Sequence, residues 1–207
     1  MMDPAQHLQR VFQNNLHRLY ERVVATSMTN LSVPQPRELE NLDTLAAGLD
    51  RAEAQVNAHT RNEAAKAFIL VLSALFERQL RQWAVHLFVQ PRKPDVQRQP
   101  FSALLTDCMT EIDMSDLGDI QDVLTEGHKI ANIVRHGDGD TSADLRQIAP
   151  RLWQSDPGAY VDINPGPSPD SALFIVTDDY LRDYTRAGLR FWGRADRLPG
   201  AVNDPPF

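Results

Sequence analysis

Apolar residues recur at intervals of three and four along most of this 207-residue chain, and this spacing limits the fold more than any other feature. The period places apolar side chains on one face of an α-helix. It predicts a first helix over Leu8–Val23, a second over Leu39–Val56 and a third from Glu63 to about Leu87. Two prolines between residues 30 and 36 separate the first two helices. The third is apolar nearly all round its first half, which is typical of the central helix of a bundle.

The second half of the chain repeats the helical pattern in shorter pieces. Prolines predict a surface loop over Gln90–Gln99, and the stretch Asp156–Asp170, rich in proline and glycine, predicts an irregular excursion. A brief strand over Ala172–Val176 is a further expectation. Capping residues set the expected helix ends. The expected helices are Phe101–Ile112, one from the N-cap Ser115 to the Gly137–Gly139 turn, one from the cap Ser142 to about Leu152, and a last one after Thr177.

These segments predict an all-α fold, a helical bundle of about five to seven helices with a short irregular or single-strand excursion before the last helix. Strands and helices do not alternate as they would in a nucleotide-binding α/β sheet. At this length we expect one domain over residues 1–193, followed by a loose tail over 194–207. Large aromatic residues are expected in the core. They are Trp83, Trp153, Phe191 and Trp192.

Charge and cysteine content narrow the setting in which the protein works. A formal net charge of −7 repels polyanions at long range, so contact with nucleic acid requires a local basic surface. The single cysteine, Cys108, cannot form an intramolecular disulfide, and the first residues lack the pattern of a secretory signal. The most apolar stretch, Ala64–Phe76, contains Lys66 and is too short to span a membrane. We therefore expect a cytoplasmic protein without a membrane contact.

Ionisable and amide side chains concentrate in the segment Glu126–Asp140, at the expected end of a helix. His128, Asn132 and His136 follow one another at intervals of four, which places them on one helical face about 6 Å apart at each step. The chain has neither a phosphate-cradling glycine loop nor a dinucleotide fingerprint, so no cofactor is expected. Any chemistry of this chain is predicted to lie in this segment.

The run Ala131-Asn-Ile-Val-Arg-His136-Gly resembles the signature of the HEPN superfamily of helical-bundle proteins. In that signature an arginine, a polar residue that is often asparagine and three further residues precede a histidine. Many members are metal-independent endoribonucleases, and paired protomers bring two copies of the motif into one RNA-cleaving cleft. The resemblance implies that Asn132 takes the polar position and His136 the histidine position.

The resemblance also implies roles for the side chains of the segment. His136 would be the general acid or base of RNA cleavage, with His128 as a second one, and Asn132 would orient the phosphate or the imidazole. Arg135 or Lys129 would neutralise the phosphate. Neither a metal nor a cofactor takes part in this scheme. The implied protein is a homodimer that acts on RNA in a bacterial toxin or defence setting.

This sequence departs from the family pattern at the arginine position. Ala131 stands there, and alanine can neither bind phosphate nor stabilise developing negative charge. Arg135, one turn further on, could supply a guanidinium from a different direction. The alternative function is a non-catalytic helical interaction scaffold that has lost the motif arginine and binds RNA or a protein partner.

Two other interpretations of the segment stay open. It could be a solvated helix end, in which His136 caps backbone carbonyls and interacts with the helix dipole. It could also bind a transition metal, because imidazole and carboxylate together suit such an ion. The ligands would be His128, His136, Asp138 and Asp140.

A second basic feature lies on the third predicted helix. Arg78 and Arg81 are three residues apart beside an aromatic residue, and such a stripe could guide RNA phosphate. Basic residues of the following segment could extend it into a patch. These are Arg92, Lys93 and Arg98. The structural alternative is that these charges only solvate a helix face.

Overall fold

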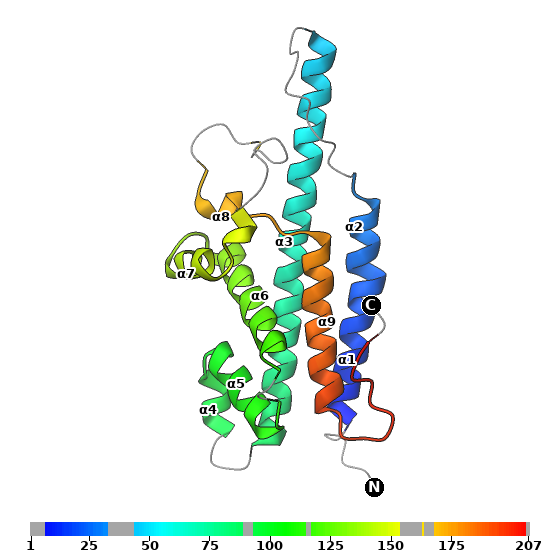
Figure 1. Cartoon of the computed structure of the whole chain (residues 1–207), viewed down its shortest axis with the longest axis vertical. Coiled ribbons are helices and arrows are strands. Elements are labelled where there is room, and N and C mark those ends of the chain that lie inside the picture. Colours follow the sequence, from blue (N-terminus) through cyan, green and yellow to red (C-terminus); the bar gives the residue numbers. More distant parts are fainter. Residues whose placement is uncertain are drawn as a thin grey trace. The chain divides into compact units, whose positions relative to one another are not determined.

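The structure is a computed structural model, and it describes residues 7–32, 44–88, 93–114, 117–153, 163 and 168–205. Every regular element in these ranges is a helix (Figure 1). The elements are α1 (Leu8–Leu19), a π-helical segment (Tyr20–Ala25), α2 (Thr26–Asn30), α3 (Leu45–Leu87), α4 (Lys93–Arg98), α5 (Phe101–Glu111), α6 (Gly118–His136), α7 (Asp140–Ile148), a 3-10 segment (Pro150–Trp153), α8 (Asp170–Leu173) and α9 (Asp178–Ala195). The predicted all-α fold is therefore confirmed. In these ranges no helix combines the length and the apolar character that crossing a bilayer requires.

The chain divides into two compact units, and α3, α6 and α9 each run from one into the other. Unit 1 comprises Met1–Val23, Val71–His128 and Arg182–Phe207, and unit 2 comprises Val24–Leu70 and Lys129–Leu181. Neither unit is a continuous stretch of sequence, because the chain enters each of them more than once. The single domain over residues 1–193 stays a prediction.

Unit 1 is built around an aromatic cluster at Trp192 of α9. Trp192 is fully buried, and its ring centroid lies 5.0 Å from that of Phe12 and 5.5 Å from that of Phe76. Trp83 and Phe191 complete the cluster, with most ring pairs arranged edge to face. Large aromatic rings packed in this way contribute much of the apolar area that a small core buries. The prediction that Trp83, Phe191 and Trp192 lie in the core is confirmed.

The segment after α9 is held against α1 within unit 1. The guanidinium of Arg10 lies 2.8 Å from the carboxylate of Asp196, which is buried. Gln13 donates hydrogen bonds to the carbonyl oxygens of Leu189 and Val202, at 2.9 and 2.7 Å. Residues 196–205 therefore have fixed partners on the first helix, although their composition predicts a loose tail. Their order depends on donors that lie almost the whole chain length away.

Unit 2 depends on polar side chains of α3 that hold irregular backbone. Arg61 donates to the carbonyl oxygens of Met28 and Leu31, where α2 ends, and forms an ion pair with Asp178. Lys66, which interrupts an apolar run in the sequence, is buried and donates to two carbonyl oxygens of α8. These bonds satisfy carbonyls that a helix end leaves without intrahelical partners.

Between α8 and α9 the amide of Asn62 hydrogen-bonds to the backbone as a neighbouring strand would. Its Nδ2 donates to the carbonyl oxygen of Phe174, and its Oδ1 accepts from the N–H of Val176, both at 3.0 Å. Asn62 is only 3% exposed, so these backbone groups have no water to replace it. Of the two forms predicted for the excursion before the last helix, the described residues show the irregular one, since Ala172 and Leu173 are helical and no strand follows.

Replacing Asn62 with alanine is expected to lower the free energy of unfolding by about 2–6 kcal/mol, because it leaves two buried backbone groups without partners, each at about 1–3 kcal/mol. Urea denaturation measures the change. Asn57→Ala is the matched control on the same helix, because the side chain of Asn57 makes no hydrogen bond with any described residue. Equal midpoints for the two variants would show that the amide does not hold the segment.

Three predicted boundaries are wrong, each for a local reason. No break separates Val56 from Glu63, because α3 is one helix of 43 residues and the sequence between them contains neither glycine nor proline. The predicted loop over residues 90–99 contains α4, whose Pro94 sits in the first turn, where a missing N–H costs no hydrogen bond. Ser142 is buried inside α7, which begins at Asp140, and does not cap it. Ser115, Arg92, Leu39 and most of residues 156–170 lie outside the described residues.

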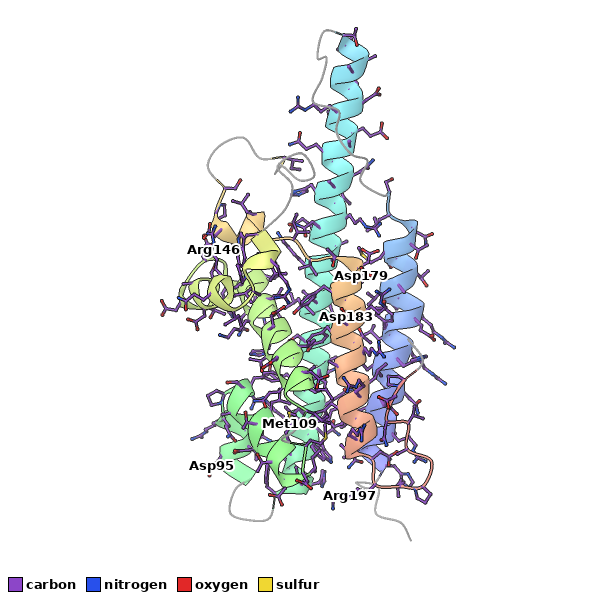
Figure 2. All side chains as sticks on the ribbon, viewed as in Figure 1. Asp95, Met109, Arg146, Asp179, Asp183 and Arg197 are labelled. Atoms are coloured by element: carbon purple, nitrogen blue, oxygen red, sulfur yellow. The ribbon has the colours of Figure 1, made fainter. Side chains whose placement is uncertain are left out.

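The first turns of α3 carry apolar side chains that remain exposed. Leu45 is 82% exposed, Leu49 61% and Val56 49%. In Figure 1 these turns, drawn in cyan, extend past the ends of α2 and α8, and Figure 2 shows their side chains standing out from the ribbon. From Leu45 onward, the stripe that predicts a separate second helix is thus helical, but it does not contribute to a core in the described part of the chain.

Candidate functional site

The motif lies on the last turns of α6, and the sequence explains why the helix stops there. The helix ends at His136, and Gly137 follows with φ of 76°, a left-handed conformation that glycine adopts at little cost. The N–H of Gly137 donates to the carbonyl oxygen of Ile133 at 2.8 Å and completes the cap. The predicted end of this helix at the Gly137–Gly139 turn is confirmed.

The motif positions differ sharply in exposure. Ala131, at the arginine position, is buried and only 4% exposed. Asn132 is half-buried, and Arg135 and His136 are exposed. None of these last three side chains hydrogen-bonds to a described residue or pairs with one. Asn132, Arg135 and His136 are therefore accessible to a ligand, whereas the arginine position is buried.

His128 belongs to a different environment, within unit 1. Its ring stacks on Phe101 with centroids 4.2 Å apart and an interplanar angle of 14°. Its Nδ1 lies 3.7 Å from Oε2 of Glu77. His128 is thus held by α3 and α5, while the other three predicted site residues lie in unit 2. Within neither unit do all four form one site, and the spacing by four of His128, Asn132 and His136 could not reveal this.

Glu77, the carboxylate beside His128, also interacts electrostatically with a buried tyrosine, Tyr184. Burial raises the pKa of the Tyr184 hydroxyl, and the negative charge of Glu77 raises it further. A hydroxyl with a raised pKa stays protonated, so Tyr184 can donate a hydrogen bond but cannot accept a proton as a base. This cluster is suited to fixing His128 and not to cleaving a phosphodiester.

The charged neighbours of the motif in unit 2 are mostly occupied. The carboxylate of Asp138 accepts hydrogen bonds from the N–H groups of Ser171 and Asp170 at 2.7 and 3.0 Å, and so caps the start of α8. The Ser171 side chain and these N–H groups hold the pKa of Asp138 below its ordinary value. Lys129, a predicted phosphate ligand, lies 3.4 Å from the carboxylate of Asp144. Arg135 is left as the unpaired cation among the predicted phosphate ligands.

The described residues give the metal alternative no support. They contain no group of three or more His, Cys, Asp or Glu side chains arranged to hold an ion. Asp138, one of the four proposed ligands, uses both carboxylate oxygens to cap α8. A metal would have to break these bonds before it could bind there.

A second candidate surface lies in unit 1, on the exposed face of α3 beside α4. It is a shallow groove of about 590 Å³ and carries both arginines of the predicted basic stripe. We call it the α3–α4 groove. Its lining residues are Ala74, Glu77, Arg78, Arg81, Gln82, Val85, His86 and Gln97. Arg98 is exposed on α4 but does not line it. The sequence stripe pointed to this surface, but α4, which supplies its wall, was predicted to be loop.

No family model, curated protein or solved structure matches this chain. The resemblance to the HEPN superfamily therefore depends on the motif between Ala131 and Gly137 and on its position at a helix end. A helical fold alone does not define a function, because one fold can carry many different functions.

Proposed function

We propose that this chain is a HEPN-like helical protein that binds RNA without cleaving it. The observation that carries the proposal is the burial of Ala131. In the family pattern an arginine at this position would bind phosphate and stabilise the charge that develops during cleavage. Here the position holds an alanine that is 4% exposed, so neither the side chain nor the space for a larger one is present at the surface.

Binding and cleavage make different demands on the remaining residues. Binding needs accessible donors that are not already paired. Arg135 and His136 are exposed, Asn132 is half-buried, and none of the three side chains pairs with a described residue. An amide, a guanidinium and an imidazole can all donate to phosphate oxygens. Cleavage would in addition need a second proton-transfer group beside His136, and His128 is committed to Phe101 and Glu77.

The proposal is tested with single-stranded RNA in the presence of a chelator. The parent protein should bind the RNA and leave its length unchanged. The double variant Arg135→Ala, His136→Ala should bind at least about tenfold more weakly, because two donors to charged oxygens are lost. Both side chains are exposed, so circular dichroism should show an unchanged fold. Arg22→Ala is the matched control, since Arg22 is exposed and lies outside the motif.

Two results would contradict the proposal. Shortened RNA with the parent and intact RNA with His136→Ala would make the protein a ribonuclease and would call for a test of Arg135 as the missing arginine. Equal, negligible binding by the parent and the double variant would remove the RNA function and favour a protein partner. The resemblance also implies a homodimer, and light scattering of the same concentrated sample would remove that part if it gave a monomer mass.

A further inference from the structure

The α3–α4 groove is preorganised by a single arginine. Within unit 1, Arg81 donates to the carbonyl oxygens of Val96 and Gln99 at the end of α4, both at 3.0 Å. The same guanidinium lies 2.7 Å from Oε1 of Glu77. Arg81 thus fastens α4 to α3 and fixes the wall of the groove. A ligand would meet this wall already formed, which reduces the entropy lost on binding.

The groove also presents basic side chains that have no partner among the described residues. Arg78 and His86 are both exposed, and neither forms a hydrogen bond or an ion pair with a described side chain or backbone group. Arg78, Gln82 and His86 follow at intervals of four along one face of α3. Arg78 and His86 are therefore about 12 Å apart along the helix axis. The groove offers two separated sites for anionic groups, with an amide between them.

The local charge of the groove is opposite to that of the chain. Its arginines carry two positive charges and Glu77 one negative charge, whereas the chain has a net charge of −7. A nucleic-acid contact on an acidic protein requires such a local basic surface. Within unit 1 the groove supplies it at a site remote in sequence from the motif on α6.

The chemistry of the lining favours single-stranded RNA over an acidic peptide. A peptide helix would need a row of apolar pockets, and only Ala74 and Val85 among the lining residues are apolar. Guanidinium and imidazole suit phosphate, the amides of Gln82 and Gln97 suit base edges, and the apolar stems of these long side chains can support a base. The imidazole of His86 can also stack on a base.

We propose that the α3–α4 groove binds the phosphate backbone of single-stranded RNA through Arg78 and His86, with Arg81 as the positioning residue of its wall. The inference rests on the proposed function, because it names a second surface for the same class of ligand, single-stranded RNA. It adds a binding site that the motif on α6 does not contain.

The experiment measures binding of a fluorescently labelled single-stranded oligouridine by anisotropy over a range of salt concentrations. Arg78→Glu should weaken binding at least about tenfold. Arg78→Ala should reduce the slope of log K against log salt by about 0.7, the value for one lost phosphate contact on a single strand. His86→Ala should weaken binding in the same direction. Arg22→Glu, the same charge change at an exposed residue outside the groove, should leave the affinity within about twofold.

The possible outcomes separate this inference from the proposed function. If Arg78→Glu binds like the parent while the Arg135→Ala, His136→Ala variant is weakened, the groove is not an RNA site and the proposed function stands. If the parent does not bind oligouridine, both fall. If polyglutamate displaces the RNA as effectively as unlabelled oligouridine does, the groove recognises acidic chains in general and the inference is overturned.

Discussion

Replacing Ala131 with arginine is expected to destabilise the protein by at least about 3 kcal/mol and to give no ribonuclease activity. The substitution restores the family motif in the sequence, but Ala131 is 4% exposed, so the guanidinium would have to be buried. An unpaired charge in such a position costs several kcal/mol, and the longer side chain adds steric strain. For a chain of this length the melting temperature should fall by roughly 6–12 °C.

The measurement combines thermal unfolding with sizing of RNA in chelator. His136→Arg is the control, because it adds an arginine to the same helix end at an exposed position and should change stability by no more than about 0.5 kcal/mol. A folded Ala131→Arg protein that shortens RNA would show that the arginine position can reach the surface. It would then make the parent a ribonuclease that has lost one residue, contrary to our proposal.

Replacing Gly127 with alanine is expected to lower the free energy of unfolding by about 2 kcal/mol, although alanine is normally the better helix former. A Cβ at Gly127 would lie 2.2 Å from the ring carbon Cε2 of Tyr184. Tyr184 is fully buried in unit 1, so its ring cannot simply move aside. The overpacking cost should exceed the gain in helix propensity of about 1 kcal/mol.

Gly118→Ala is the matched control for this prediction. Gly118 lies on the same helix, and a Cβ there would have nothing within 4 Å. That variant should be as stable as the parent or slightly more stable, because alanine restricts the unfolded chain. Equal denaturation midpoints for Gly127→Ala and Gly118→Ala would show that α6 and α9 can separate at Tyr184 without cost.

Helix positions with strong local signals were predictable from the sequence. The stop at Gly137 and the last helix, whose Thr177 Oγ1 accepts from the N–H of Tyr180 at 3.1 Å, follow from interactions among residues a few positions apart. The break expected before Glu63 was wrong, because only the spacing of apolar residues indicated it and no residue there could end a helix. For these elements the deciding hydrogen bonds are local, so the sequence carries them.

Exposure and partners along α6 were decided only by the tertiary structure. His128 and His136 share a spacing and a residue type, yet His128 is held by Phe101 and Glu77 while His136 is exposed. No local rule places Ala131 in the interior, because that depends on which face of α6 unit 2 covers. The helical period shows that residues share a face, and only packing decides which face is buried.

The sequence by itself determined the all-helical class, some helix ends such as the stop at Gly137, and the motif with its alanine at the arginine position. The tertiary structure decided that this alanine is buried and that Arg81 binds backbone carbonyls of α4, sixteen residues or so along the chain. The physical reason is the distance along the sequence between the residues that interact. Helix formation depends on hydrogen bonds between residues four apart. Burial and ion pairing depend on contacts between segments that can be far apart in the sequence, and the sequence gives no simple rule for which segments meet.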